Sequence, residues 1–309
     1  MNIKNKTILV TGASGVIGLH FLKGLQSHNA PVYAVHNRPI RESLSQLVGI
    51  NFIQGDLTDM SFLKSLPTVD IIIHSATFSS PKLFTSNPIS TLKLNTLTTF
   101  ELLDKLNEGG KFLYISTAEV YSGLLNHVPF EESQLGTTNT KHPRACYIEG
   151  KRCGETICIS SGKDVKIARI GTTYGESART DDGRVLYDFV NQGLKYNKVT
   201  AKGGLHDIRE FCYVTDAIEM MWNILLNGKE VIYNIGGGDI VEIGGLAKIV
   251  AKMTDSSVEL IEDGRTPWLY CIMNMEKYNS EFGKHKNITL SEGISRVINW
   301  YKTNNEKIE

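Results

Sequence analysis

The feature of this sequence that most restricts its fold is a glycine-rich octapeptide, TGASGVIG, at residues 11–18. It follows a short apolar run, TILVT at 7–11, and a segment with the apolar spacing of a helix comes after it. A strand that turns at once into a helix needs residues without a Cβ, and Gly12, Gly15 and Gly18 supply them. Backbone N–H groups at the start of such a helix attract phosphate. The segment therefore predicts a strand, a phosphate-binding turn and a helix, as at the start of a dinucleotide-binding fold.

Further strands and helices alternate along the first half of the chain. Apolar runs predict strands at Val32 to Val35, Asn51 to Gln54, Asp70 to His74, Lys111 to Ser116 and Val165 to Ile170. Helical spacing of apolar residues predicts a helix at Val16 to Gln26 and one long helix at Pro88 to Leu106. Continuous apolar strands between helices are typical of a parallel sheet covered on both faces. We therefore predict an α/β fold with a Rossmann-like, doubly wound parallel sheet.

The pattern changes after residue 170. Loops rich in glycine, aspartate and threonine follow, with helical segments at Val185 to Tyr196, Val214 to Leu226 and Ile243 to Thr254. We predict a dinucleotide-binding domain over residues 1–170. Residues 171–309 are predicted to form mainly a smaller substrate-binding region, some segments of which return to the Rossmann sheet.

Composition excludes several classes of protein. The 33 basic and 33 acidic residues give zero formal net charge, whereas generic nucleic-acid binding needs positive charge to neutralise phosphates. The five cysteines include no CxxC pair, so neither a disulfide scaffold nor a metal site is expected. The opening MNIKNKTILVTG lacks the apolar stretch of a signal peptide, and no apolar run approaches the ~20 residues that span a bilayer. We expect a cytoplasmic protein that binds neither nucleic acid nor a membrane.

The end of the second predicted strand bears on which dinucleotide is bound. An acidic residue there usually hydrogen-bonds the adenosine ribose, but this chain has His36, Asn37 and Arg38. The planar fork of Arg38 can pair with a 2′-phosphate, whereas Asn37 can serve an unmodified ribose. Arg38 thus favours NADP slightly, and the choice between NAD and NADP stays open.

Residues after the other strands complete the predicted cofactor site. Asp56 and Leu57 are expected at the adenine. HSAT, at 74–77, is expected at the pyrophosphate and nicotinamide ribose, with His74 itself interpreted as a structural histidine. The residues expected to bind the cofactor on these grounds are Gly12, Ser14, Gly15, Val16, Ile17, Gly18, Asn37, Arg38, Asp56, Leu57, Ser75, Ala76 and Thr77.

Tyr147 and Lys151 form a candidate catalytic pair. Residues four apart share one face of a helix, so the ammonium can approach the phenol. An adjacent cation stabilises the phenolate, and we therefore expect Lys151 to lower the pKa of Tyr147 and make it usable as a base near neutral pH. Thr117, at the end of the fifth predicted strand, can hydrogen-bond the substrate oxygen that Tyr147 deprotonates. Together with the glycine-rich turn, these residues predict an enzyme active site.

These motifs resemble those of the extended short-chain dehydrogenases/reductases, in the branch of nucleotide-sugar epimerases, dehydratases and decarboxylases. The resemblance covers nearly the whole chain and rests on TGASGVIG, DLTD at 56–59, HSAT, Asn95, ISTAEVY at 115–121, Tyr147 with Lys151, ARIGTTYG at 168–175 and IREFCYVTDA at 208–217. Within that branch, CYIEGKRCGE at 146–155 and TDDGRVLYDFV at 180–190 look most like UDP-glucuronate decarboxylases.

The resemblance implies a tightly held nicotinamide cofactor and transient oxidation of a sugar at C4. By this likeness Tyr147 takes the proton of the C4 hydroxyl, Lys151 holds the nicotinamide ribose, and Thr117 orients the substrate. Glu119 matches the position that acts as a base at C5 in the dehydratases and is also glutamate in the decarboxylases. A 4-ketone acidifies the C5 proton and turns a C5 carboxylate into a β-keto acid that loses CO₂. The resemblance also adds Asn95, Tyr147 and Lys151 to the cofactor-binding set.

The same resemblance implies substrate-binding residues and an oligomeric state. Arg209 matches the arginine that grips the nucleotide diphosphate, Arg184 is expected to face the substrate, and Thr117 contacts the sugar. Thr172 stands where many relatives have asparagine. A homodimer is implied, through the helices around 92–106 and 146–158.

Two departures from the family pattern leave the reaction open. Ala118 replaces an acid of the dTDP-glucose dehydratases, which lowers the expectation of plain dehydration. Trp268, in Arg265-Thr266-Pro267-Trp268, replaces an acid near the C-terminus. Decarboxylation, epimerisation and 4,6-dehydration remain variants of the leading interpretation. The alternatives are an NADPH-dependent reductase of a 4-keto nucleotide sugar and a non-catalytic nucleotide-binding regulator.

Overall fold

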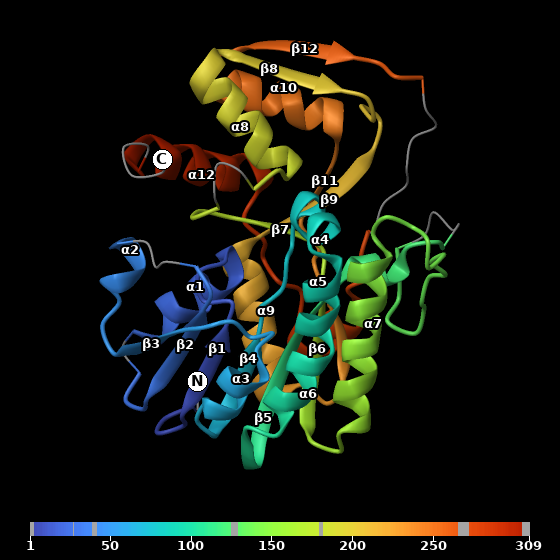
Figure 1. Cartoon of the computed structure of the whole chain (residues 1–309). Helices are drawn as coiled ribbons and strands as arrows, with labels where there is room; N and C mark the ends of the chain where they lie inside the picture. Colours follow the sequence, from blue (N-terminus) through green and yellow to red (C-terminus); the bar gives the residue numbers. More distant parts are fainter. Residues whose placement is uncertain are drawn as a thin grey trace.

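A seven-stranded parallel sheet forms the centre of the molecule, shown in Figure 1 as a computed structural model. The structure describes residues 3–26, 28–38, 42–124, 129–178, 182–264 and 272–304. Across the sheet the strands run β10 (Ile232–Ile235), β6 (Asp164–Ile170), β5 (Leu106–Thr117), β4 (Val69–His74), β1 (Ile8–Thr11), β2 (Val32–His36) and β3 (Ile50–Gln54). Neighbouring strands pair in parallel throughout.

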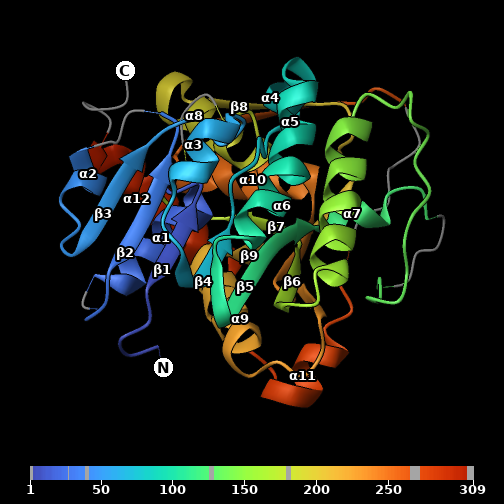
Figure 2. The same ribbon diagram turned by 60° about the horizontal axis from the view of Figure 1, so that its bottom comes forward.

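Helices cover both faces of this sheet. The face shown in Figure 2 carries α3 (Met60–Ser65), α5 (Pro88–Asn95), α6 (Leu97–Leu103) and α7 (Ala145–Ser160). The opposite face carries α1 (Val16–Leu25) and α9 (Val214–Asn227). Ile8 and Val10 pack into the core of the α1 face and Leu9 into the other, because successive side chains of a strand point to opposite faces. The prediction of an α/β fold with a doubly wound parallel sheet is confirmed.

A second group of elements lies above the central sheet in Figure 1. It contains a three-stranded sheet, ordered β11 (Asp239–Glu242), β9 (Ile208–Tyr213) and β7 (Thr172–Tyr174), and a two-stranded sheet of β12 (Ser257–Ile261) and β8 (Lys198–Lys202). The accompanying helices are α8 (Val185–Tyr196), α10 (Ile243–Met253) and α12 (Leu290–Asn304). The strand β10 comes from this half of the chain but joins the central sheet beside β6. The domain boundary at residue 170 stays a prediction.

Shorter elements connect these layers. They are α2 (Glu42–Ser45), α4 (Pro81–Ser86), the 3₁₀ turn η1 (Ala118–Tyr121) and α11 (Glu276–Phe282). In the described ranges, no helix is both long enough and apolar enough to cross a membrane.

The prediction of one long helix at Pro88 to Leu106 is wrong. The helix α5 ends at Asn95, α6 begins at Leu97, and Leu106 already belongs to β5. At the junction, Thr96 has φ −119° and ψ −79°, and its hydroxyl donates to the Leu92 carbonyl at 2.8 Å. A threonine hydroxyl bonded back to the preceding turn is a known cause of helix bending.

Candidate active site

The glycine-rich turn between β1 and α1 leaves no room for side chains. Gly12 has φ +69°, and a Cβ there would lie 2.9 Å from the Cα of Ala76. A Cβ at Gly18 would lie 2.3 Å from the Gly12 carbonyl oxygen. Gly15 is the N-cap of α1, so this helix begins directly after the turn, at Val16. The crowded glycines and the open helix N-terminus fit a dinucleotide pyrophosphate.

The segment after β4 lies against this turn. The Ser75 hydroxyl donates to the Thr11 carbonyl at 2.6 Å, and the Ala76 N–H donates to the Thr11 hydroxyl at 3.2 Å. Two polar atoms in this region are buried without a hydrogen-bond partner among the described residues, Oγ1 of Thr77 and Oδ1 of Asn95. Groups of this kind require a partner, and a bound polar ligand would supply one.

His74 has the contacts of a structural residue, in agreement with its interpretation from the sequence. Its Nε2 donates to the Leu94 carbonyl at 3.2 Å and its Nδ1 accepts from the Thr11 hydroxyl at 2.8 Å. Burial, aided by the charge of Lys151, lowers the pKa of His74 to about 3. The imidazole is therefore neutral at physiological pH.

The remaining residues of the predicted cofactor set lie at the ends of β2 and β3. His36 is buried and its Nδ1 donates to the Arg38 carbonyl at 2.7 Å, while the side chains of Asn37 and Arg38 are exposed. The Asp56 carboxylate accepts from the Thr58 N–H at 2.8 Å, and the buried Leu57 accepts through its carbonyl from the Thr98 hydroxyl. Ser14, Val16 and Ile17 belong to the glycine-rich turn and the first turn of α1.

The structure brings Thr117, Glu119 and Tyr147 together. Tyr147 and Thr117 are each 7% exposed, and the Thr117 side chain lowers the pKa of the phenol, as expected for a neighbouring hydroxyl. The Glu119 N–H donates to the same threonine oxygen at 3.2 Å. The phenol ring stacks on Phe84 with centroids 4.8 Å apart and planes 10° apart.

The predicted effect of Lys151 on Tyr147 is wrong in this structure. The pKa of Tyr147 is raised to about 12, by burial first and by the Glu119 carboxylate second. The Lys151 ammonium instead donates to the Ile115 carbonyl at 2.6 Å and lies 4.7 Å from the Tyr114 ring centroid. Burial lowers the pKa of Lys151 to about 7. Desolvation penalises the charged form of each residue. It therefore raises the pKa of the tyrosine and lowers that of the lysine, and it favours the neutral form of both side chains.

Arginine side chains flank the phenol, and the sequence reasoning missed one of them. Arg144, just before α7, grips both carboxylate oxygens of Glu119. Arg184 is held by Asp182 at 2.5 and 3.0 Å and donates to the Thr173 carbonyl at 3.1 Å. Both guanidinium charges lower the pKa of Tyr147 and so counteract part of the increase that burial causes. The RACY sequence at 144–147 offered a signal, because a cation three residues before the tyrosine shares its helix face.

Thr172 and Arg209 lie in the three-stranded sheet. Thr172 follows Ile170, the strand partner of Thr117, by two residues, so it lies near the catalytic strand end. Arg209 is on β9, where it pairs with Val241 of β11. The motif residues Thr180, Asp181 and 265–268 lie outside the described residues.

A buried ionic network supports the site from behind, and sequence patterns gave no sign of it. Glu155, one turn beyond Lys151 on α7, pairs with Arg169 of β6 at 2.7 Å and accepts from the Ser116 hydroxyl at 2.5 Å. Arg169 also donates to the Tyr121 hydroxyl at 3.1 Å. The network joins β6 to α7, β5 and η1, and these last three elements carry the candidate catalytic side chains.

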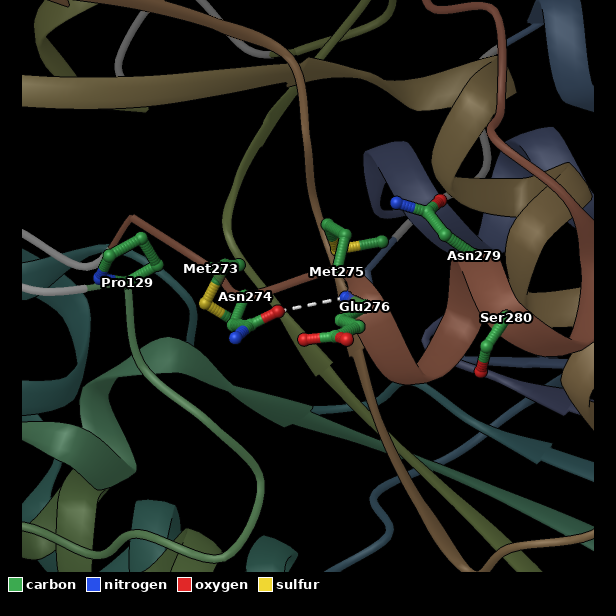
Figure 3. Close-up of a pocket in the computed structure, with 7 residues that line it drawn as sticks. All are labelled: Pro129, Met273, Asn274, Met275, Glu276, Asn279 and Ser280. Carbon is green, nitrogen blue, oxygen red and sulfur yellow. Dashed lines mark hydrogen bonds between the residues drawn. The ribbon is translucent and has the colours of Figure 1, made fainter.

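A surface hollow of about 550 Å³ occurs elsewhere (Figure 3). Its lining residues are Pro129, Met273, Asn274, Met275, Glu276, Asn279 and Ser280. Asn274 accepts there from the Glu276 N–H at 2.8 Å. None of the predicted site residues lines this hollow, so it is separate from the candidate active site.

Comparisons with known proteins agree with this geometry. The sequence is 33% identical to UDP-glucuronic acid decarboxylase 6 of Arabidopsis thaliana over 274 residues, which is 85% of this chain and 78% of the relative. It is 29% identical to UDP-glucuronic acid decarboxylase 1 of Xenopus tropicalis over 96% of this chain and 72% of that protein.

Solved structures share the fold. A UDP-glucose 4-epimerase from Thermotoga maritima superposes with a TM-score of 0.84 at 22% identity, covering 97% of this chain and 99% of that one. A dTDP-glucose 4,6-dehydratase from Streptomyces venezuelae gives 0.83 at 24% identity, covering 97% and 98%. Residues 8–236 match the sequence model of the NAD dependent epimerase/dehydratase family. The expected relationship is confirmed, and the chain belongs to the NAD dependent epimerase/dehydratase family.

Proposed function

We propose that this protein oxidises C4 of a nucleotide-linked sugar transiently and decarboxylates a nucleotide-linked uronic acid. The observation that carries the proposal is the convergence of Thr117, Glu119 and Tyr147 on one strand end. The similarity to UDP-glucuronic acid decarboxylases over 85% of the chain favours decarboxylation over epimerisation. Ala118, where the dTDP-glucose dehydratases carry an acid, speaks against 4,6-dehydration.

The glycine-rich turn is the proposed cofactor site. Gly12, Gly15 and Gly18 cradle the pyrophosphate, and Thr77 and Asn95 offer the buried polar atoms that lack a protein partner among the described residues. Bound there, a nicotinamide dinucleotide would supply a reversible acceptor for the hydrogen that leaves C4. The remaining residues of the predicted cofactor set keep their assignments as proposals.

Tyr147 is the proposed proton acceptor for the C4 hydroxyl. Burial raises the pKa of its phenol to about 12, so the phenol has to lose its own proton before it can accept that of the C4 hydroxyl. The Thr117 hydroxyl and the charges of Arg144 and Arg184 favour the phenolate. Thr117 also orients the sugar, while Lys151 braces the strand through the Ile115 carbonyl and holds the nicotinamide ribose. Glu119 is the proposed base at C5, and Arg184, Arg209 and Thr172 are proposed substrate contacts.

A turnover assay tests this function. Purified protein is incubated with UDP-glucuronic acid, with and without added NAD, and the products are weighed by mass spectrometry. We expect a UDP-sugar lighter by one CO₂. UDP-, GDP-, CDP- and dTDP-linked sugars extend the panel to other bases and neutral sugars. Failure to change any of them would contradict the proposal, and binding without turnover would favour a nucleotide-binding regulator.

Net reduction of a 4-keto nucleotide sugar is the second candidate. It is favoured by the exposed Arg38 and by His36 in place of an acid, because these residues tolerate a 2′-phosphate. The structure of the Streptomyces venezuelae dehydratase, by contrast, holds NAD. A reductase consumes NADPH stoichiometrically with a keto-sugar, whereas an internally recycling enzyme does not. Loss of NADPH absorbance therefore separates the two, and titration with NAD and NADP settles the preferred cofactor.

A homodimer is the proposed assembly. Large apolar side chains are exposed on neighbouring helices, with Ile89 on α5 63% exposed and Leu97 and Phe100 on α6 53% and 56% exposed. Both helices pack against α7. Exposed apolar side chains gathered on adjacent helices mark contact surfaces, and a second copy would cover them.

A further inference from the structure

The guanidinium of Arg144 has one edge in use and one edge open. Its Nε donates to Oε2 of Glu119 at 2.9 Å, and its Nη2 donates to Oε1 of the same carboxylate. Among the described residues, Nη1 has no acceptor. The side chain of Arg144 is 36% exposed, so the open edge is accessible to a ligand.

The position of this guanidinium is fixed relative to the phenol of Tyr147. The Arg144 Cζ lies 5.1 Å from the centroid of the Phe84 ring, and the same ring stacks on Tyr147 at 4.8 Å. The charge of Arg144 also lowers the pKa of the phenol, as expected for a near neighbour. Arg144 therefore lies close to the group proposed to react at C4 of the sugar.

We propose that Arg144 selects an acidic sugar by binding its carboxylate on the open Nη1–Nη2 edge. This inference rests on the proposed function and names the residue that distinguishes a uronic acid from a neutral sugar. The planar guanidinium carries five donors and can hold two carboxylates along different edges. The Nε–Nη2 edge keeps Glu119 in place, and the positive charge offsets the repulsion between Glu119 and the incoming carboxylate.

Binding measurements test the selection. UDP-glucuronic acid and UDP-glucose are titrated by calorimetry into the NAD-loaded Tyr147→Phe protein, in which turnover is blocked. Arg144→Gln is expected to weaken the affinity for UDP-glucuronic acid about tenfold or more, because charge-assisted bidentate hydrogen bonds are lost. The affinity for UDP-glucose is expected to change less than about twofold. Arg144→Lys, which keeps the charge but not the fork, is expected to recover part of the loss.

Arg296→Gln is the matched control. Arg296, on α12, also pairs with a glutamate, Glu292 at 2.6 Å, lies 5.3 Å from an aromatic centroid and is 42% exposed. It should change neither affinity. Glu119→Gln is expected to strengthen binding of the acidic sugar, because a competing negative charge is removed.

The outcomes separate this inference from the proposed function. Equal losses for both sugars in Arg144→Gln, or unchanged affinity for the acidic sugar, would overturn the assignment. If Glu119→Gln lost affinity for UDP-glucuronic acid as Arg144→Gln does, Arg144 would only position Glu119 and would not bind the sugar. If the Tyr147→Phe protein itself binds neither UDP-sugar, the proposed function fails first. Melting temperatures verify folding, and Arg144→Lys carries the test should the glutamine variant not fold.

Discussion

At the scale of single residues, burial outweighs local charge in the candidate site. The spacing of Tyr147 and Lys151 correctly places both on α7, but the expected depression of the phenol pKa is absent. Both side chains are nearly inaccessible to solvent, at 7% and 2% exposure. Desolvation then dominates over charges that are several ångströms away.

Replacing Tyr147 by phenylalanine tests the proposed proton acceptor. Turnover should fall about 10²- to 10⁴-fold, the usual contribution of general acid–base catalysis. The ring still stacks on Phe84, so the melting temperature and the affinity for the nicotinamide cofactor should change little. Steady-state assays and cofactor titration measure these effects. Activity comparable to that of the unmodified protein would remove Tyr147 from the mechanism.

The pKa of Lys151 predicts a pH-dependent stability. Because this pKa is about 7 in the folded protein against 10.5 for the ordinary side chain, the unfolded chain binds more protons between these values. The unfolding free energy of the unmodified protein should therefore rise with pH, relative to Lys151→Met, by at most about 1.4 kcal/mol per pH unit. The gain is lost as pH falls towards 7.

Urea denaturation at several pH values between 7 and 10 measures this difference. The exposed Lys163 provides the control, since Lys163→Met should leave the pH profile parallel to that of the unmodified protein. A difference between Lys151→Met and the unmodified protein that stays constant with pH would contradict the prediction.

At the scale of elements, the helix α1 contains two glycines that can be compared directly, Gly18 at the glycine-rich turn and Gly24 near its end. A Cβ at Gly18 would lie 2.3 Å from the Gly12 carbonyl oxygen, whereas a Cβ at Gly24 would meet nothing within 4 Å. Gly18→Ala should destabilise the protein by about 1–3 kcal/mol and weaken cofactor binding. Gly24→Ala should stabilise it by about 0.5–1 kcal/mol. Chemical denaturation and cofactor titration would detect both, and equal effects would show that the turn relaxes.

The predicted elements show which sequence patterns are reliable. The apolar run Asp70 to His74 matches β4 within one residue, because both faces of the central sheet are covered, whereas β5 begins at Leu106, five residues before the predicted run Lys111 to Ser116. The strands β8 and β12 escaped prediction, since their side chains are partly exposed and their runs are short and polar. The continuous apolar spacing across 88–106 concealed a break at Thr96, which depends on a side-chain hydrogen bond.

At the scale of the whole molecule, the site is assembled from distant segments by the order of the strands. The strands β1, β4 and β5 are parallel neighbours in the sheet. The glycine-rich turn, the HSAT segment and Thr117 therefore meet at the carboxyl ends of these strands. The buried ion pair of Glu155 and Arg169 joins α7 to β6 and so holds Tyr147, also on α7, beside these strand ends.

The proposed dimer is tested at this scale. Phe100→Asp would place a charge in the apolar surface of α6 and should weaken self-association by about 2 kcal/mol or more. Light scattering during gel filtration measures the mass. Ile240→Asp, at a 52% exposed apolar residue of β11, is the control and should leave the mass unchanged. A monomeric unmodified protein would refute the assembly.

Local sequence was sufficient for the α/β architecture, the glycine-rich turn and the shared helix face of Tyr147 and Lys151. These features depend on residue size, apolar periodicity and spacings within one turn, all of which are local properties. Only the tertiary structure decided that Arg144 grips Glu119, that Phe84 supports both Arg144 and Tyr147, and that Lys151 donates to Ile115. Those contacts join residues from 25 to 63 positions apart in the sequence, and the burial that shifts the pKa values of Tyr147 and Lys151 arises only when the layers pack together.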